Sequence, residues 1–245
     1  MSTVLILGAG SDIARAIAEA LAARGDGLIL AGRRQAELAR DAAALASRHQ
    51  VPARAVAFDA LDTHSHAAFW QSLQPAPDGV VCAVGLLDEQ AAAEQDFARA
   101  RAMLETNFTG CVSILDQAAR HFAVANSGFI VGISSVAGDR GRASNYYYGA
   151  AKAGLTAYLS GLRNRFAGQG QAVRVITVKP GFVATRMTAG MNLPRALTAS
   201  PEQVARAVLR ALKGRRDVIY VRWFWRWIMA LITHLPEAVF KRTRL

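Results

Sequence analysis

Three consecutive tyrosines, Tyr146, Tyr147 and Tyr148, precede a small-residue segment that contains one lysine, Lys152. Only Tyr148 stands four residues before Lys152, and residues four apart lie on one face of a helix. A phenol, whose pKa is about 10, is a poor acid–base catalyst at neutral pH. A neighbouring ammonium group favours the phenolate and brings that pKa toward the working range. The pair predicts proton transfer at a substrate oxygen; the alternative is a core helix that contains both residues by chance.

A glycine turn follows the first apolar run of the chain, in the stretch GAGSDIARAIA. Backbone N–H groups at the start of a helix, together with the positive end of the helix dipole, hold a pyrophosphate. Gly8 and Gly10 allow a phosphate to approach closely, because a Cβ atom would obstruct it, and Ser11 is expected to cap the helix. The turn therefore predicts a dinucleotide site.

The second apolar run ends in LILAGRR, which bears on the choice of cofactor. A carboxylate at the position of Gly32 would accept hydrogen bonds from the adenosine ribose and favour NAD(H). Arg33 and Arg34 follow instead, which suits a 2′-phosphate and favours NADP(H) over NAD(H). The alternative is two solvated arginines at the start of a helix. Asp59, after the third run, is expected either to accept from the adenine amino group or only to cap the strand.

No metal site is expected. His64 and His66 stand near Asp62, and we expect exposed histidines at a helix start rather than metal ligands. Cys82 and Cys111 lie in apolar stretches without metal-ligand spacing, so they are expected to be buried thiols in a reducing compartment.

Short apolar runs alternate with long alanine-rich segments along the whole chain. The expected strands are Thr3–Leu7, Leu28–Ala31, Ala53–Phe58, Gly79–Val84, Phe129–Ser134, Val173–Lys179 and Val218–Val221. The expected helices cover residues 11–24, 35–48, 64–73, 91–124, 147–168 and 201–213. The strand runs lack polar alternation, which indicates strands covered on both faces. We predict one α/β domain over residues 1–245: a Rossmann-type, doubly wound parallel sheet of about seven strands with helices on both faces.

Composition narrows the class of partner. The net charge is +11, but the arginines are spread along the chain, and no basic run interleaved with aromatic residues occurs before residue 215. Anionic ligands or anionic lipid headgroups are favoured over nucleic acid. The chain shows no signal peptide and no run of about 20 apolar residues, so a cytoplasmic protein is expected, at most peripheral at a membrane face.

Two segments fall outside the alternation of strands and helices. Residues 185–200 contain glycine, proline and methionine without a clear period, and a flexible substrate loop is expected there. Residues 222–245 form an aromatic and then basic C-terminal extension, in which the 13-residue run from Trp223 to Leu235 is too short to span a bilayer. This extension is expected either to lie in a membrane interface or to cover the substrate pocket or a subunit contact. Its aromatic and basic residues include Arg222, Trp223, Phe224, Trp225, Arg226, Trp227, Lys241, Arg242 and Arg244.

The stretch SSVAGDRGRASNYYYGAAKAGL, together with the glycine turn, resembles the short-chain dehydrogenase/reductase family, and the resemblance spans the whole chain. It implies a serine 13 positions before the catalytic tyrosine, which is Ser135 and not Ser134. Ser135 would hydrogen-bond the substrate carbonyl oxygen, and Asn107, in LETNFTG, would order a water that relays protons from Lys152. The residues expected at the cofactor are Gly8, Gly10, Ser11, Asp12, Ile13, Arg33, Arg34, Asp59, Ala60, Gly85, Pro180, Gly181, Val183 and Thr185.

The chain departs from the family pattern in two places. Asp12 and Ala14 stand where the family usually has the second and third glycines of its turn. An Asn-Asn-Ala-Gly segment is replaced by Cys82-Ala83-Val84-Gly85, which removes a side-chain brace. A carboxylate at Asp12 would repel a pyrophosphate unless it points away from it.

A narrower resemblance concerns the substrate. The stretches FDALDTHSH, VGLL, GDRGRASNYYYG and HLPEAVFKR are similar to those of reductases that act on polyprenyl-phosphate-linked 2-keto-pentoses, in the second half of an epimerisation. The alternatives are a soluble carbonyl, such as a 3-ketoacyl thioester or a steroid-like ketone, and a dinucleotide-binding scaffold or sensor without turnover. The family resemblance also implies a homodimer or homotetramer formed through the helices of Asn107 and Tyr148.

Overall fold

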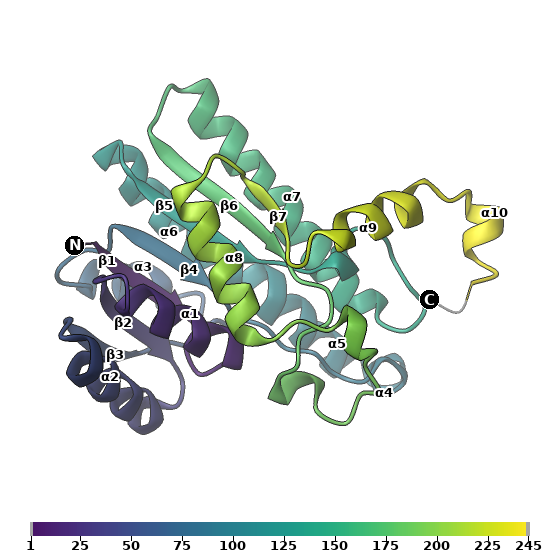
Figure 1. The fold of residues 1–245 in the computed structure, drawn as a ribbon, viewed down its shortest axis with the longest axis horizontal. Coiled ribbons are helices and arrows are strands. Elements are labelled where there is room, and N and C mark those ends of the chain that lie inside the picture. Colours follow the sequence, from purple (N-terminus) through teal and green to yellow (C-terminus); the bar gives the residue numbers. More distant parts are fainter. Residues whose placement is uncertain (1, 244–245) are drawn as a thin grey trace.

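One parallel sheet lies at the centre of the protein, with seven strands in the order β3-β2-β1-β4-β5-β6-β7 (Figure 1). The computed structural model describes residues 2–243. The strands are β1 (Thr3–Leu7), β2 (Gly27–Gly32), β3 (Ala53–Ala57), β4 (Gly79–Cys82), β5 (Gly128–Ile133), β6 (Val173–Lys179) and β7 (Val218–Tyr220). The fold predicted from the alternating pattern is confirmed, and the predicted strand bounds differ by two residues at most.

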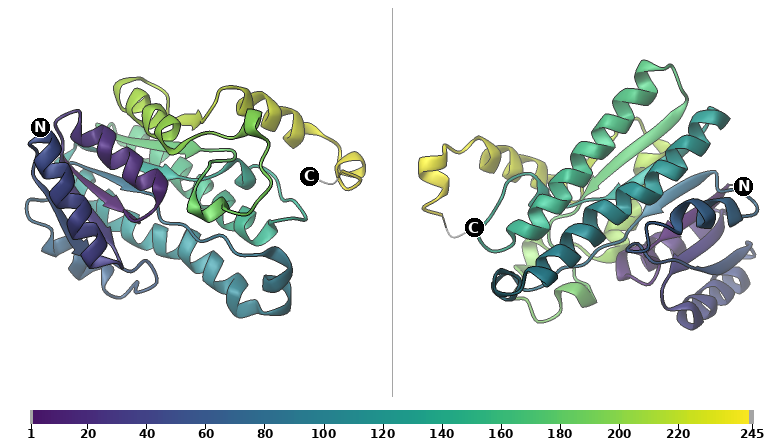
Figure 2. Two further views of the ribbon diagram at one scale, coloured as in Figure 1. Left: turned by 60° about the horizontal axis from the view of Figure 1, so that its bottom comes forward. Right: turned by 180° about the vertical axis from the view of Figure 1, so that it is seen from behind.

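Helices cover both faces of the sheet, which explains why the strands are apolar on both sides. The helices are α1 (Asp12–Ala22), α2 (Gln35–His49), α3 (His66–Ser72), α4 (Gln90–Gln95), α5 (Phe97–Leu104), α6 (Gly110–Ala125), α7 (Tyr146–Gly168), α8 (Pro201–Lys213), α9 (Phe224–His234) and α10 (Glu237–Phe240). One apolar cluster joins α1, α2 and α8 to the sheet, and a second joins α3, α6 and α7 to its other face. Figure 2 shows α6 and α7 side by side across the back of the molecule.

The order of the strands reverses beside β1. Leu7, at the end of β1, pairs with Ala31 of β2 on one side and with Cys82 of β4 on the other. In open α/β sheets, ligands bind outside the carboxyl ends of the strands at such a point. The segments that follow β1, β2, β4 and β5 are therefore the ones that can form a site.

The helix expected over residues 91–124 is not continuous, and that prediction was wrong. Asp96 has an extended backbone and its side chain accepts a hydrogen bond from Ala98 N, so α4 ends and α5 begins there. A π-helical turn, Glu105–Thr109, then separates α5 from α6. Such turns are rare and often occur at functional sites. This one contains Asn107.

The expected exposure of the two histidines is correct for His64 and wrong for His66, which is fully buried. The His66 ring stacks on Phe58, and its nitrogens lie 2.9 Å from Ser113 Oγ and 3.0 Å from the carbonyl oxygen of Asp59. His66 thus fixes the turn after β3. Both cysteines are buried free thiols, as predicted.

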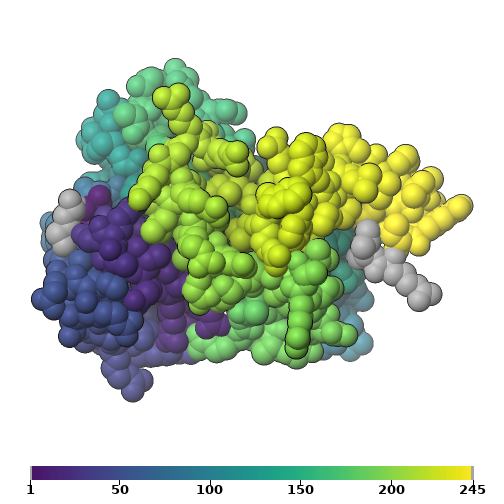
Figure 3. Space-filling view, in the orientation of Figure 1, coloured from purple at the N-terminus to yellow at the C-terminus, as the bar shows by residue number. Residues whose placement is uncertain are grey.

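The two segments outside the alternation have defined structure as far as residue 243. Residues 185–200 contain two short 3₁₀ turns, and a bridge between Val183 and Ala199 closes the base of the loop. The segment that contains α9 and α10 projects from one end of the molecule, in yellow in Figure 3. Between residues 2 and 243, no helix has the length and hydropathy needed to cross a bilayer.

Candidate active site

The four residues expected to be catalytic come from three segments that meet at the carboxyl edge of the sheet. Ser135 follows β5, Tyr148 and Lys152 lie in the first turns of α7, and Asn107 lies in the π-helical turn. Gly85, just after β4, marks where they converge. A Cβ atom on Gly85 would lie 3.3 Å from Asn107 Oδ1 and 3.7 Å from Lys152 Nζ.

Lys152 is held by the ends of two strands. Its side chain is buried, with the residue only 3% exposed, and Nζ donates to the carbonyl oxygens of Ile133 (3.1 Å) and Val84 (3.4 Å). The ammonium group lies 5.7 Å from the centroid of the Tyr148 ring. A buried cation held by neutral carbonyls acts strongly on a neighbouring phenol, because the surroundings screen it little.

The two serines after β5 have different partners. The Ser134 hydroxyl lies 2.9 Å from the carbonyl oxygen of Lys152 and 2.7 Å from Thr156 Oγ1, so it fastens α7 to the sheet. The Ser135 Oγ accepts from Ala137 N at 3.1 Å, at the start of a 3₁₀ turn. This leaves the Ser135 hydroxyl hydrogen available to donate to a substrate oxygen.

Asn107 is fully buried and joins the π-helical turn to the segment after β4. Its Nδ2 donates to the carbonyl oxygens of Leu86 (2.6 Å) and Met103 (2.9 Å), and its Oδ1 accepts from Leu86 N (3.2 Å). These bonds fix the amide orientation, with Oδ1 on the side of Lys152. A carbonyl oxygen fixed there can accept from a water that also contacts the ammonium group.

The three tyrosines at the start of α7 are not equivalent. The Tyr146 hydroxyl donates to Glu94 Oε1 at 3.0 Å. Partial desolvation, this hydrogen bond and the neighbouring Tyr147 raise the pKa of Tyr146 to about 12. Tyr146 and Tyr147 have ring centroids 4.6 Å apart, whereas Tyr148 is the tyrosine beside the Lys152 ammonium. No residue from 2 to 243 hydrogen-bonds the Tyr148 hydroxyl.

The glycine turn has the form that a pyrophosphate site needs. Gly8 has a φ of +73°, and a Cβ atom there would lie 2.8 Å from Val84 N, so only glycine fits. Ser11 caps α1 by accepting from Ala14 N. Within the described chain, the N–H groups of Gly10, Asp12 and Ile13 donate to no protein acceptor. These three donors at a helix N-terminus fit a dinucleotide pyrophosphate.

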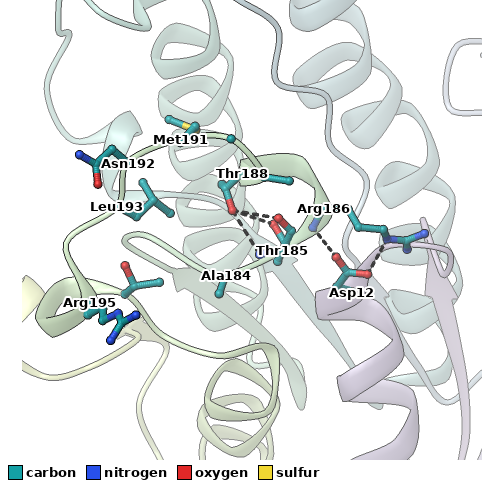
Figure 4. A pocket seen from close by; sticks show the side chains of 12 residues that line it. Asp12, Ala184, Thr185, Arg186, Thr188, Met191, Asn192, Leu193 and Arg195 are labelled. Carbon is teal, nitrogen blue, oxygen red and sulfur yellow. Dashed lines mark hydrogen bonds and ion pairs between the residues drawn. The ribbon is translucent and has the colours of Figure 1, made fainter.

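Asp12 pairs with an arginine from the loop of residues 185–200. Its carboxylate accepts from Arg186 N (2.7 Å) and Arg186 Nε (2.8 Å), as Figure 4 shows. Arg186 Nη2 also donates to the carbonyl oxygen of Gly10 at 2.6 Å. The negative charge that the sequence places at the pyrophosphate turn is therefore paired.

The two arginines after β2 differ in what they contact. Arg34 Nη2 donates to the Gly10 carbonyl oxygen at 3.0 Å, and Arg34 Nε lies 3.0 Å from Glu37 Oε2. Arg33 is exposed and makes no ion pair or side-chain hydrogen bond with any described residue. Of the two, Arg33 is the one with its full set of donors available for a 2′-phosphate.

The turn after β3 places Asp59 and Ala60 near the carboxyl edge of the sheet. Asp59 is exposed and its Oδ1 accepts from Leu61 N at 3.0 Å, so one oxygen caps the turn and the other remains available. Ala60 is buried. The capping role of Asp59 is therefore present, and contact with an adenine stays a prediction.

The segment after β6 lies against the start of the 3₁₀ turn that follows Ser135. The carbonyl oxygen of Pro180 accepts from Val136 N at 3.0 Å, and Val183 is buried. Thr185 begins the loop and caps its first turn with Thr188. A Cβ atom on Gly181 would overlap the indole of Trp225, so α9 packs directly on this segment.

A cavity of about 670 Å³ lies between the loop and the N-terminus of α1 (Figure 4). Its lining includes Asp12, Thr185, Arg186, Met191 and Arg195, and none of the four residues expected to be catalytic. Met187, from the same loop, instead approaches the catalytic group, because its Cε would lie 3.7 Å from a Cβ atom on Gly85. The loop therefore borders both the cavity and the catalytic group.

Sequence reasoning missed the long-range partners of these residues. Arg186 meets Asp12 across 174 residues, and Trp225 meets Gly181 across the loop and α8, so no spacing pattern reveals either contact. The sequence shows Gly181, but it does not show that the Trp225 indole leaves no room for a side chain at that position.

Comparisons with known proteins support the fold and identify the family. Residues 2–196 match the family model described as short chain dehydrogenase. An uncharacterised oxidoreductase of Mycobacterium tuberculosis is 40% identical over 242 residues, covering 98% of this chain and 96% of that relative. The 3-oxoacyl-[acyl-carrier-protein] reductase of Aquifex aeolicus is 29% identical over 218 residues, which cover 84% of this chain and 87% of that relative.

A solved structure shows the same fold. The short-chain dehydrogenase from Sphingobium yanoikuyae, in complex with NADPH, has a TM-score of 0.82 at 23% identity and covers 97% of this chain and 98% of its own. None of these three relatives has a name that specifies a lipid-linked sugar, so the narrower resemblance stays a prediction. The chain belongs to the short-chain dehydrogenase/reductase family and is an NAD(P)-dependent oxidoreductase that acts on CH–OH and C=O groups.

Proposed function

We propose that the protein reduces a ketone to a secondary alcohol with NADPH, and that Tyr148 donates the proton. The observation that carries this proposal is the placement of Lys152, buried between two strand-end carbonyls and adjacent to both Tyr148 and Asn107. A buried ammonium group at this point has no evident structural purpose, since an apolar side chain would cost less to bury.

Each of the four residues has one task. Ser135 donates a hydrogen bond to the carbonyl oxygen, where negative charge develops during reduction. Tyr148 gives its proton to that oxygen, and the Lys152 ammonium stabilises the phenolate that remains. Asn107 holds a water that returns a proton from solvent through Lys152. NADPH, when bound, supplies the hydride.

The preference for NADPH is supported by Arg33, which is exposed and available after β2, and by the absence of a carboxylate at Gly32. The pyrophosphate would lie on the N–H groups of Gly10, Asp12 and Ile13. Asp59, Ala60 and Gly85 would border the adenosine and nicotinamide parts, with Pro180, Gly181, Val183 and Thr185 beside the nicotinamide. A homodimer or homotetramer formed through α6 and α7 stays a prediction.

A second candidate concerns the substrate: a lipid-linked keto-sugar rather than a soluble carbonyl. It is favoured by α9, whose inner residues Trp225, Met229 and Ile232 pack with Val136, next to Ser135. The outer residues Trp223, Trp227 and Leu231 are 76%, 65% and 68% exposed. An apolar helix between a reaction site and solvent suits a prenyl chain, and exposed tryptophans beside basic residues suit a membrane interface. Arg244, one of the expected basic residues, lies outside the described residues.

The test of the reaction is NADPH consumption by the purified protein with a panel of carbonyls. The panel includes acetoacetyl-CoA, a cyclic ketone, a steroid ketone and a polyprenyl-phosphate-linked 2-keto-pentose. We expect one class to give the secondary alcohol in a 1:1 ratio to NADPH, and Lys152→Met to lose turnover while still binding NADPH. Turnover at the wild-type rate in Lys152→Met would contradict the mechanism. NADPH binding without reduction of any member would favour the scaffold alternative.

The test of the membrane contact uses vesicles that contain anionic lipid. Removing residues 222–245 would also expose Gly181 and Val136, so the sharper variant is Trp223→Ser with Trp227→Ser, which changes only exposed side chains. Co-sedimentation of the wild type and its loss in the double variant are expected. A wild type that does not sediment would exclude the membrane role and leave α9 as a cover of the pocket.

A further inference from the structure

The pair Asp12–Arg186 joins the two parts of the site that must close around a dinucleotide. Asp12 is the first residue of α1, beside the N–H groups expected to hold the pyrophosphate. Arg186 is the first residue of the 3₁₀ turn at the start of the substrate loop. Arg186 donates three hydrogen bonds to this region: two to the Asp12 carboxylate and one to the Gly10 carbonyl oxygen.

A carboxylate at this place has an electrostatic cost. A pyrophosphate at the N-terminus of α1 would lie close to the Asp12 carboxylate, and like charges at that distance repel. Arg186 offsets this charge, and its Nη1 makes no hydrogen bond within residues 2–243. The guanidinium can thus contact a phosphate oxygen while its other nitrogens hold Asp12 and Gly10.

The same arginine fixes the loop relative to the rest of the site. Its neighbour Met187 reaches the Gly85 position beside Lys152. The far end of the loop is fixed independently, because the carbonyl oxygens of Leu197 and Thr198 accept from Trp225 Nε1 (3.2 Å) and Arg222 Nη1 (2.8 Å). The start of the loop is held to the turn at α1 by Arg186 and to its own base by Thr188, whose Oγ1 donates to the carbonyl oxygen of Val183 at 2.7 Å. Release of Arg186 would therefore loosen, on one side, the part of the loop that borders the catalytic group.

We propose that Asp12 is a positioning residue: it holds Arg186 over the pyrophosphate turn, so that cofactor binding and the position of the substrate loop depend on each other. Arg186 is the residue that contacts the cofactor. This inference rests on the proposed dinucleotide site. It gives a role to Asp12, the acidic residue that stands where the family usually has the second glycine of the turn.

The test is a double-mutant cycle on NADPH binding, followed by the fluorescence of the reduced nicotinamide, so that it does not depend on turnover. The variants are Asp12→Asn, Arg186→Ala and the two combined. We expect Arg186→Ala to weaken NADPH binding about tenfold or more in the wild-type background, because it leaves Asp12 unpaired beside the phosphates. In the Asp12→Asn background the same change is expected to cost about threefold or less.

Arg195→Ala is the matched control, because Arg195 lines the same cavity and makes no ion pair with any residue the structure describes. Its effect on NADPH binding is expected to be equal in both Asp12 backgrounds. Arg186→Lys keeps the charge but not the paired N–H geometry, and partial recovery is expected. Amide exchange of residues 186–193 in the free protein is expected to rise in Asp12→Asn and not in Arg195→Ala.

The outcomes separate this inference from the proposed function. If the wild type binds no NADPH, the proposed function fails. If it binds NADPH but Arg186→Ala has the same effect in the wild-type and Asp12→Asn backgrounds, Asp12 does not act through Arg186 and the inference is wrong. Unchanged exchange of the loop in Asp12→Asn would likewise contradict the positioning role.

Discussion

The indole of Trp225 lies directly against the backbone of Gly181, in the segment expected to border the nicotinamide. The ring also contacts Phe182, with centroids 5.5 Å apart, and its Nε1 donates to the carbonyl oxygen of Leu197. A glycine is needed at position 181 because any side chain would displace the ring. Helix α9 thus packs on the segment expected to border the nicotinamide.

The first prediction tests this contact. Gly181→Ala is expected to destabilise the protein by about 1–3 kcal/mol, since the added methyl group overpacks a filled space. Gly161→Ala is the control, because a Cβ atom there meets nothing within 4 Å, and alanine is the better helix former. Chemical denaturation measures both. Equal stability of Gly181→Ala and the wild type would mean that α9 does not pack on this segment.

The second prediction concerns a buried ion pair behind the site. Asp139 accepts from Lys179 Nζ at 2.5 Å and from the Tyr220 hydroxyl at 2.8 Å, and the side chains of Lys179 and Asp139 are only 10% and 6% exposed. Asp139→Asn leaves Lys179 buried without its counter-charge, so the free energy of unfolding is expected to fall by about 3 kcal/mol or more.

A more exposed pair provides the comparison. Asp88 binds Arg99 near the surface, and Asp88→Asn is expected to cost about 1 kcal/mol or less. Urea denaturation of the two variants compares the sites. If Asp88→Asn lowers the free energy of unfolding as much as Asp139→Asn does, burial does not explain the contribution of the Asp139–Lys179 pair to stability.

The third prediction separates the two arginines after β2. Arg33 has its donors available, whereas Arg34 is engaged with Gly10 and Glu37. Arg33→Ala is expected to reduce the preference for NADPH over NADH by about tenfold or more, as expected for the loss of a charge-assisted hydrogen bond. Arg34→Ala should change the affinity for both cofactors alike, because it loosens the glycine turn. Titration of each variant with both dinucleotides decides the matter; an unchanged preference in Arg33→Ala would refute the assignment.

The sequence predicts most of the framework because its signals are local. Apolar runs without alternation indicate buried parallel strands, and the spacing between Tyr148 and Lys152 is enough to distinguish one of the three tyrosines. The break at Asn107 was not predictable in this way, since helix propensity is high on both sides of the π-helical turn. His66 was misjudged because its burial depends on Phe58 and Ser113, which the chain brings to it from other elements.

The contacts between segments that are distant in the sequence could not be predicted from local sequence patterns either. In the sequence, Asp12 places a negative charge in a turn that is expected to bind phosphate, which is unfavourable. Only the fold reveals that Arg186 lies beside it and pairs with that charge. The sequence shows that the C-terminal extension is rich in aromatic and basic residues, but not which of them face the protein. The structure shows that Trp225 is buried and that Trp223 and Trp227 are exposed. Both cases depend on tertiary packing, which determines what a charged or aromatic residue contacts.

The central claim is that Tyr148, and neither of its neighbours, donates the proton. The most direct measurement is the single-turnover rate of carbonyl reduction at saturating NADPH in Tyr146→Phe, Tyr147→Phe and Tyr148→Phe. All three variants remove one hydroxyl from the same turn of α7, so they serve as controls for one another. We expect Tyr148→Phe to be slower than the wild type by about 100-fold or more, and the other two to remain within about fivefold. A near-normal rate in Tyr148→Phe, or an equal loss in Tyr146→Phe, would contradict the account.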